Sequence, residues 1–253
     1  MVAPWQREYP PGRMIPEEMR HITLAFLGQA SVSKIKNLLP GLPRPNFVIG
    51  STGIAKTLVF LPKGRSRVAA FTVDWLDAER QIDHYQQTLS EWLRNQGYIL
   101  DKKPFFPHLS VARSPFDKEL WQSQFSSLPF FIKAIHLYQS MGNLQYQSLW
   151  EHSLLSPFEE FEHTADIAFL IRGHSNQELH RHAQLALAFK FPPLVELLNS
   201  PLQNSLDEII ISLNELVATA DIEFGCPFKA VSFHGTIKAN EHDILQWEMI
   251  VDV

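Results

Sequence analysis

Apolar and polar residues alternate over several short runs in the first 155 residues, and such alternation predicts half-buried β-strands. One strand is expected from His21 to Gly28, and another begins at His108. Shorter strands are expected at 47–49, 57–61, 68–73, 130–139 and 147–153. Residues 1–20 are rich in proline and show little periodicity, so we expect a mostly irregular lead-in.

Helical spacing of apolar residues predicts three helices in the same half, at 31–39, 74–95 and 117–125. In the longest, Asp74 or Asp77 can cap the first turn, and Gly97 suits the position just after the last one. The order of strands and helices predicts an α+β fold with helices packed on a mostly antiparallel sheet.

The second half begins a new pattern. A strand is expected at 161–171, closed by Gly173, and Ser175 with Glu178 forms a capping box for a helix to Phe189. Asn204 or Ser205 is expected to cap a second helix, and 228–237 with 244–253 is expected to form a closing hairpin. Positions i and i+2 of a helix do not face each other, so we expect His180-Arg181-His182 at the surface.

Charge divides the chain in the same place. Residues 1–155 hold 17 Lys+Arg and 12 Asp+Glu, a net +5, whereas residues 156–253 hold 5 and 15, a net −10. With Ser156-Pro157 as the boundary, we expect two domains, 1–155 and 156–253. The basic domain could meet nucleic acid and the acidic one a cation or a basic protein. The alternative is solvated surface charge without a partner.

Composition favours a soluble, cytoplasmic protein. No run reaches the roughly 18 apolar residues of a membrane span, and the N-terminus lacks the pattern of a signal peptide. The single cysteine, Cys226, cannot form an internal disulfide, which fits a reducing compartment.

Two matching stretches carry the candidate chemistry: His21-Ile22-Thr23-Leu24 and His108-Leu109-Ser110-Val111. Side chains of a strand alternate between faces, so each histidine shares a face with the hydroxyl two positions later. If the two strands are neighbours, two imidazoles and two hydroxyls converge. Histidines can act as general base and general acid near neutral pH, and hydroxyls can donate to phosphate oxygens. Arg113 could add a fixed positive charge.

Residues 21–28 and 108–113 resemble the signature strands of the two-histidine phosphoesterases, within which the RNA 2′,3′-cyclic phosphodiesterase (2′-5′ RNA ligase) family fits best. The resemblance covers roughly residues 12–153. It implies that His21 protonates the leaving 3′ oxygen, that His108 activates water, and that Thr23, Ser110 and Arg113 bind the phosphate. The implied substrate is RNA ending in a 2′,3′-cyclic phosphate, such as tRNA fragments, and no cofactor is implied.

The second half resembles archease, the small protein that activates the tRNA-splicing type of RNA ligase. His163-Thr164-Ala165-Asp166 resembles its opening motif, and the resemblance spans 159–253 through 206–216, 228–235 and 251–253. It implies a small α+β sandwich and a divalent cation, Ca²⁺ or Mg²⁺, held by Asp166, Asp252 and the terminal carboxylate of Val253, near Lys229. Oxygen ligands of this kind suit hard cations. The implied partner is an RNA ligase.

Together these features indicate a bifunctional RNA end-processing protein. One alternative is a non-catalytic ligase cofactor with a degraded phosphoesterase half, because members of the first family carry a further strand and helix ahead of the first histidine. Another is a two-histidine enzyme that acts on a small cyclic nucleotide.

Overall fold

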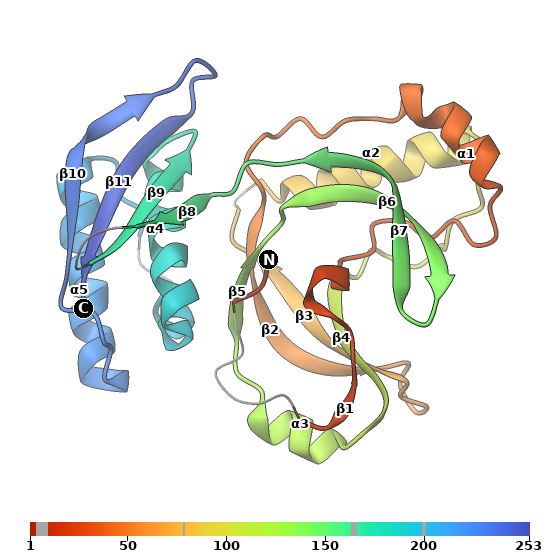
Figure 1. The fold of residues 1–253 in the computed structure, drawn as a ribbon, viewed down its shortest axis with the longest axis horizontal. Helices are drawn as coiled ribbons and strands as arrows, with labels where there is room; N and C mark the ends of the chain where they lie inside the picture. Colours follow the sequence, from red (N-terminus) through yellow and green to blue (C-terminus); the bar gives the residue numbers. More distant parts are fainter. Residues whose placement is uncertain (4–9, 78, 163–165, 199–200) are drawn as a thin grey trace. The chain divides into compact units, whose positions relative to one another are not determined.

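The structure, a computed structural model, describes residues 1–253 except 4–9, 78, 163–165 and 199–200 (Figure 1). By its internal contacts the chain forms two compact units. The first comprises most of the chain up to Ser126 together with Ile132–Leu154, and the second comprises mainly Ser127–Phe131 and Leu155–Val253. Each is described by itself.

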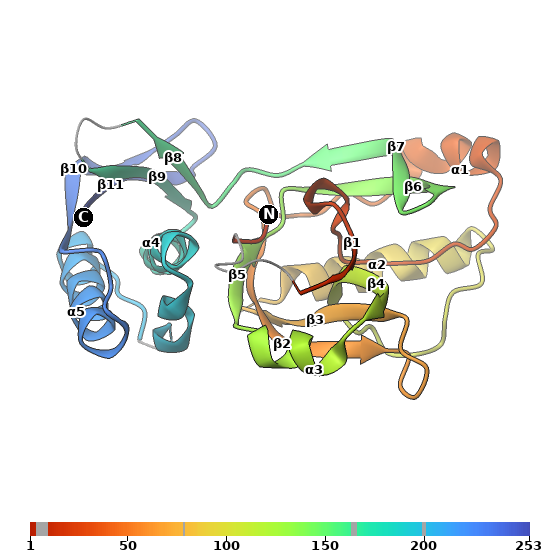
Figure 2. The ribbon, with the colours of Figure 1, turned by 60° about the horizontal axis from the view of Figure 1, so that its bottom comes forward.

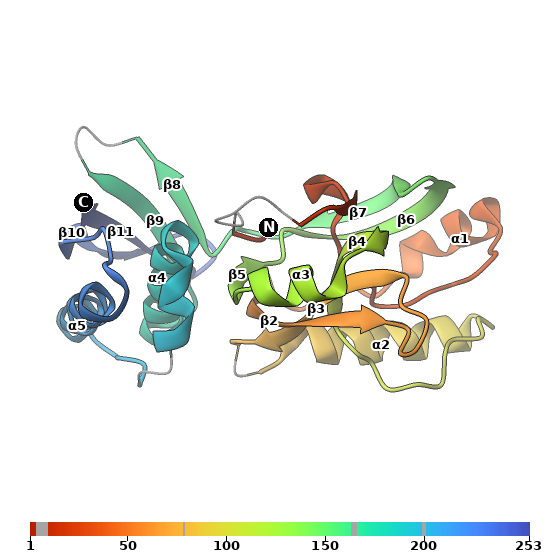
Figure 3. The same cartoon turned by 90° about the horizontal axis from the view of Figure 1, so that it is seen from below.

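A curled antiparallel sheet is the framework of the first unit (Figure 3). Within this unit its strand order is β1-β4-β3-β2. The bounds are β1 Gly12–Met14, β2 Thr52–Leu61, β3 Val68–Trp75 and β4 His108–Phe116, whereas β5, Leu128–Phe131, belongs to the second unit. A separate hairpin follows, formed by β6, Ala134–Gly142, and β7, Gln145–Ser153.

Helices of the first unit are α1 Val32–Leu38, α2 Gln81–Asn95 and α3 Lys118–Gln124, with short 3₁₀ turns η1 Glu17–Met19 and η2 Leu39–Gly41. The start of α2 lies later than expected because residues up to Trp75 continue strand β3. Asp77 caps it, its Oδ2 accepting from Gln81 N at 2.8 Å. Gly97, with φ +84°, ends it as expected, since Tyr98 N donates back to Leu93 O.

The apolar side of α2 packs into the core of the first unit. Ile82 and Tyr85 are buried against Phe47, Ile135 of β6 and Leu154, the residue that follows β7. Leu24, close behind the first histidine motif, packs against this cluster. The helix and the hairpin are thereby fixed around the same core as the segment that carries His21.

Several expected strands of this half differ in the structure. The 21–28 segment is not a strand; only Ile22 forms an isolated antiparallel bridge, to Leu109. The expected strand at 130–139 is divided between β5 and β6, and 47–49 forms none. Conversely, the lead-in contains β1, paired to β4. Alternation reveals extended backbone, but a strand also needs a partner along its length, which the local pattern does not show.

The second unit is a two-layer sandwich. Its sheet has the order β10-β11-β9-β8, and both long helices lie on one face (Figure 2). The strands are β8 Phe158–Phe161, β9 Ile167–Gly173, β10 Ala230–Ala239 and β11 Leu245–Asp252. The helical segments are α4 Asn176–Lys190, η3 Pro192–Leu197 and α5 Leu206–Phe224. The expected strand at 161–171 is confirmed only from Ile167, where β9 begins, because Phe161 ends the separate antiparallel strand β8. The closing hairpin is confirmed.

The expected helix starts of this unit are confirmed by their hydrogen bonds. Glu178 N donates to Ser175 Oγ at 3.2 Å, and His174 N donates to the Glu178 carboxylate at 2.7 Å. Gly173 ends β9 where the chain turns into α4. A Cβ there would lie 2.8 Å from Leu179 N, so the close approach of strand and helix requires glycine.

His180 and His182 are buried in α4, which corrects the surface position expected for them. Their exposed fractions are 0% and 6%. His182 Nδ1 donates to Arg172 O on β9, whereas His180 Nδ1 accepts from Gln203 N at 3.0 Å. The helix is covered on two sides, by the sheet and by the segment after η3, so residues that do not face each other are both enclosed.

Within the described ranges, no helix combines the length and apolar character needed to cross a membrane.

Acidification is expected to destabilise the second unit through His180. Burial, and then the charge of Arg181, lowers the pKa of His180 from 6.5 to about 4. The unfolded chain binds this proton more tightly, so the stabilising contribution is complete above pH 6.5 and is lost as the pH falls toward 4. Between about pH 7.5 and pH 5, the loss should be about 2 kcal/mol, measured by urea unfolding.

The matched variant is His180→Asn, whose amide oxygen can accept from Gln203 N but does not titrate. Burial also lowers the pKa of His182, which acts in the same direction, so the variant should retain only part of the pH dependence. An unchanged dependence would contradict the assignment to His180.

Candidate active site

The two histidine motifs lie side by side in the first unit. Leu109 of β4 pairs with Phe71 of β3 on one side and bridges Ile22 on the other. In this antiparallel register, His21 lies opposite Ser110, and Thr23 lies opposite His108. The neighbours of a paired residue point to the opposite face, so all four polar side chains share one face.

The two faces of the sheet differ in solvent exposure at this point. Phe71, Leu109 and Val111 are buried on the core side. On the opposite side, His21, His108 and Ser110 are half-buried and Thr23 is exposed. The polar groups are therefore held on a packed apolar layer while remaining accessible to a solute.

A bulge in β4 brings Arg113 to the same face. Ser110 pairs with Ala70 but Ala112 pairs with Ala69, so Val111 is an extra residue in β4. Val111 and Ala112 then both point to the core, where both are fully buried, and Arg113 returns to the side of His108 and Ser110. Strict alternation would have placed Arg113 on the core side.

Arg113 lies directly opposite a second arginine, Arg13 of β1. The Nε atom of Arg113 is buried, and no hydrogen-bond partner for this atom is found within the described residues. Like charges opposite each other across two strands are unfavourable, and an unsatisfied buried donor is costly. A bound anion would reduce the repulsion between the two arginines and would supply an acceptor for the buried Nε.

The imidazoles of His21 and His108 are each oriented by a hydrogen bond to a backbone carbonyl. His21 Nδ1 donates to Met19 O at 2.8 Å, and His108 Nδ1 donates to Phe106 O at 2.9 Å. A carbonyl can only accept, so Nδ1 carries the proton in each neutral ring and Nε2 holds the lone pair. Each ring can thus accept a proton at Nε2, or donate one from there when it is protonated.

Aromatic side chains surround the rings. Tyr138 of β6 and Tyr146 of β7 lie beside His21, with centroid distances of 5.7 and 5.0 Å. Phe106, half of whose surface is exposed, stacks on His108 at 5.5 Å. Burial, followed by the charge of Glu151, raises the pKa of Tyr138, so its hydroxyl stays neutral.

The structure therefore brings together the residues expected in the first half: His21, Thr23, His108, Ser110 and Arg113. Sequence reasoning missed Arg13, Tyr138 and Tyr146. Arg13 lies in the segment expected to be irregular, and the tyrosines lie on a distant hairpin whose approach to His21 leaves no local signal.

The residues expected to bind a cation lie at one end of the second unit. Ile167 pairs with Val251 at the end of β9, so Asp166 and Asp252 each directly adjoin this last pair in sequence. Lys229 Nζ donates to the Val253 carbonyl and lies 3.8 Å from Asp252 Oδ1. The donors are all oxygens, as a hard cation requires.

Among the described residues, no group of three His, Cys, Asp or Glu side chains is arranged to hold a metal ion. His163, Thr164 and Ala165 of the opening motif lie outside them.

No protein-family model matches the chain, and the comparison with curated proteins found no significant match. Ten chains of solved structures match it. A phosphoesterase is 22% identical with a TM-score of 0.43, the match covering 59% of this chain and 87% of that one. E. coli LigT complexed with 3′-AMP is 22% identical with a TM-score of 0.41, covering 56% and 81%. The protein TT0787 of Thermus thermophilus is 19% identical with a TM-score of 0.43, covering 59% and 85%. Because these TM-scores are below 0.5, assignment of the chemistry rests on the side chains themselves.

Nitrogen NMR should detect the shared tautomer of His21 and His108. In the neutral form of each ring, both Nε2 atoms should resonate as unprotonated, pyridine-type nitrogens. The Nδ1 atoms should resonate as protonated ones because each donates to a backbone carbonyl. His21→Gln and His108→Gln variants assign the signals. A protonated Nε2 in either ring would contradict the hydrogen bonding described.

Proposed function

We propose that the first unit hydrolyses the 2′,3′-cyclic phosphate at RNA ends to a 2′-phosphate. The observation that carries this proposal is the bridge between Ile22 and Leu109, which sets two imidazoles and two hydroxyls on one accessible face. The identical tautomers support it, because both rings present the nitrogen that a proton-transfer reaction needs.

In the proposed reaction, His108 Nε2 takes a proton from water as the water oxygen attacks phosphorus. The bond between phosphorus and the 3′ oxygen breaks, and protonated His21 gives its Nε2 proton to that oxygen. The products are a 2′-phosphate and a 3′-hydroxyl, and proton transfer back between the rings through solvent restores the enzyme. Such paired acid–base catalysis needs no metal ion in the reacting centre.

Thr23, Ser110 and Arg113 would stabilise the charge that develops on the non-bridging phosphate oxygens. Hydroxyl donors and a fixed guanidinium act most strongly where charge increases in the transition state. Arg13, opposite Arg113, would add to the positive potential. The unsatisfied Nε of Arg113 supports this role, since a phosphate oxygen would supply its missing acceptor.

Turnover of an RNA oligonucleotide with a 2′,3′-cyclic phosphate end, assayed with EDTA present, tests the proposal. His21→Ala and His108→Ala should each lower kcat by about 10²- to 10⁴-fold, because each removes one proton-transfer step. The control is His84→Ala on the exposed side of α2, which should leave turnover unchanged. Product analysis should give the 2′-phosphate.

Other outcomes identify the alternatives. Absence of turnover by the wild type, with retained RNA binding that His21→Ala weakens, would favour a non-catalytic RNA-ligase cofactor. Equal turnover of a nucleoside 2′,3′-cyclic phosphate and of the oligonucleotide would favour a small cyclic nucleotide as substrate.

For the second unit, we propose an archease-like role in which Asp166, Asp252 and the Val253 carboxylate bind Ca²⁺ or Mg²⁺ and the unit activates a tRNA-splicing RNA ligase. The pairing of Ile167 with Val251 supports the cation site, because Asp166 and Asp252 directly adjoin these two paired residues. Lys229 would have to leave Asp252 as a cation enters. The proposal is compatible with the first one, since such ligases use the same RNA ends.

Calorimetric titration with Ca²⁺ and Mg²⁺ should detect binding to the whole chain that Asp252→Asn weakens by at least about tenfold, because the loss of one charged ligand is large at a hard-cation site. Glu241→Gln removes an exposed carboxylate elsewhere in the unit and should leave the affinity unchanged. Equal weakening by both variants would indicate general charge screening and contradict the site.

A further inference from the structure

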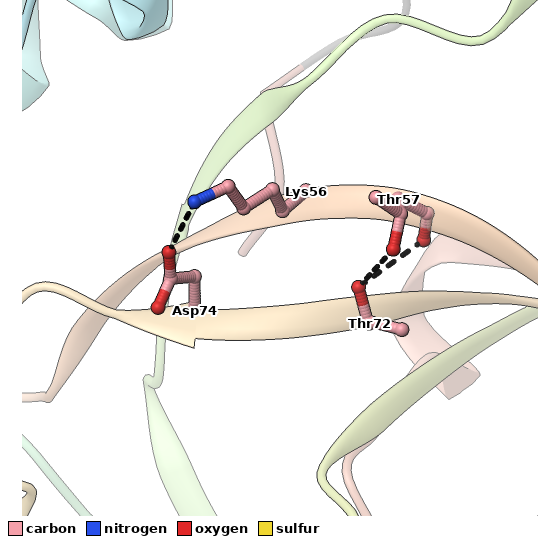
Figure 4. Close-up of polar contacts among 4 residues, drawn as sticks. All are labelled: Lys56, Thr57, Thr72 and Asp74. Atoms are coloured by element: carbon pink, nitrogen blue, oxygen red, sulfur yellow. Dashed lines mark hydrogen bonds and ion pairs between the residues drawn. The ribbon is translucent and has the colours of Figure 1, made fainter.

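A second bulge extends the polar face away from the histidines. In β2, Ala55 pairs with Val73 but Thr57 pairs with Thr72, so Lys56 is an extra residue. Lys56 and Thr57 consequently point to the same side of the sheet, although they are adjacent in sequence. Their contacts show this, because they reach Asp74 and Thr72, which are two positions apart in β3 and share a face (Figure 4).

These contacts are specific. Lys56 Nζ donates to Asp74 Oδ2 at 2.8 Å. Thr57 Oγ1 and Thr72 Oγ1 lie 2.5 Å apart, and Thr72 Oγ1 donates to Thr57 O at 3.4 Å. The two strands are thus joined by a pair of hydroxyls with an ammonium beside them.

These four side chains lie on the face of the sheet that carries the paired histidines. Thr72 pairs with His108 across β3 and β4, so Thr57, Thr72, His108 and Thr23 form one row across the sheet. Neighbouring strands are about 4.8 Å apart, which sets the backbone of β2 about 10 Å from that of His108. A ligand group next to the reacting phosphate could span this distance.

The ion pair can exchange its partner at little cost. The side chains of Lys56 and Asp74 are 61% and 55% exposed. Exposed pairs of this kind are worth about 1 kcal/mol or less, so a phosphate with favourable geometry can draw the ammonium toward itself. Asp74 then limits how strongly the site attracts anions.

We propose that Lys56, supported by the Thr57–Thr72 pair, binds the phosphate on the 5′ oxygen of the terminal nucleotide. This inference rests on the proposed function, because it takes the cyclic phosphate to lie between His21 and His108. In RNA this group is the linkage to the preceding nucleotide, whereas a nucleoside 2′,3′-cyclic phosphate with a free 5′-hydroxyl lacks it. Lys56 is therefore a specificity residue that selects a polynucleotide end over a free nucleoside cyclic phosphate.

The test compares adenosine 2′,3′-cyclic phosphate carrying a 5′-phosphate with the same compound carrying a 5′-hydroxyl. The wild type should have a KM about tenfold lower for the 5′-phosphorylated compound, as one charge-assisted contact provides. Lys56→Gln should lose most of this preference, with kcat for both compounds and KM for the 5′-hydroxyl compound unchanged. Lys63→Gln, an exposed lysine in the β2–β3 turn, should keep the preference.

Asp74→Asn supplies a change in the opposite direction. It removes the carboxylate that competes for Lys56, so it should lower KM for the 5′-phosphorylated compound and widen the preference. Were the ion pair only a brace between β2 and β3, Asp74→Asn and Lys56→Gln would alter the two substrates alike, and this would overturn the inference.

The remaining outcomes separate the inference from the function on which it rests. If the wild type converts both compounds with equal KM and Lys56→Gln changes neither, the subsite is refuted and the proposed hydrolysis stands. If the wild type converts neither compound nor the cyclic-ended oligonucleotide, the proposed hydrolysis itself fails.

Discussion

A single antiparallel bridge, from Ile22 to Leu109, is the constraint on which the candidate active site depends. The segment around Ile22 has no continuous strand to hold it, so one paired residue sets its register against β4. Leu24 anchors the same segment in the core formed by α2 and the β6–β7 hairpin. A shift of one residue would turn His21 and Thr23 toward the core and Ile22 toward solvent, at the cost of burying two polar groups.

The histidines are held by backbone as well as by packing. Each imidazole donates to the carbonyl two residues before it, from Met19 and Phe106. The 3₁₀ turn η1 supplies the first of these carbonyls, so the short turn between β1 and the bridge has a definite role: it fixes which nitrogen of His21 is available. Orientation and tautomer are thereby set by local geometry, independently of any ligand.

Two bulges complete the polar face. One in β4 turns Arg113 toward the histidines, and one in β2 keeps Lys56 and Thr57 on the same side. Each bulge changes the alternation by one residue, which moves every later side chain of that strand to the other face. The sheet thus carries Arg13 and Arg113 at one end of the histidine pair and Lys56 at the other, and the proposed subsites for phosphate follow from that arrangement.

The sequence by itself determined the local features whose cause lies within a few residues. It identified the cap at Ser175, the end of α2 at Gly97, the closing hairpin, and the repeated pattern of histidine, apolar residue and hydroxyl. Only the tertiary structure decided that 21–28 is not a strand, that Arg113 faces the histidines, that Tyr138 and Tyr146 lie beside His21, and that His180 and His182 are buried. Each of these depends on a partner strand, a bulge or a distant segment, and periodicity along one chain carries no information about what lies across from it.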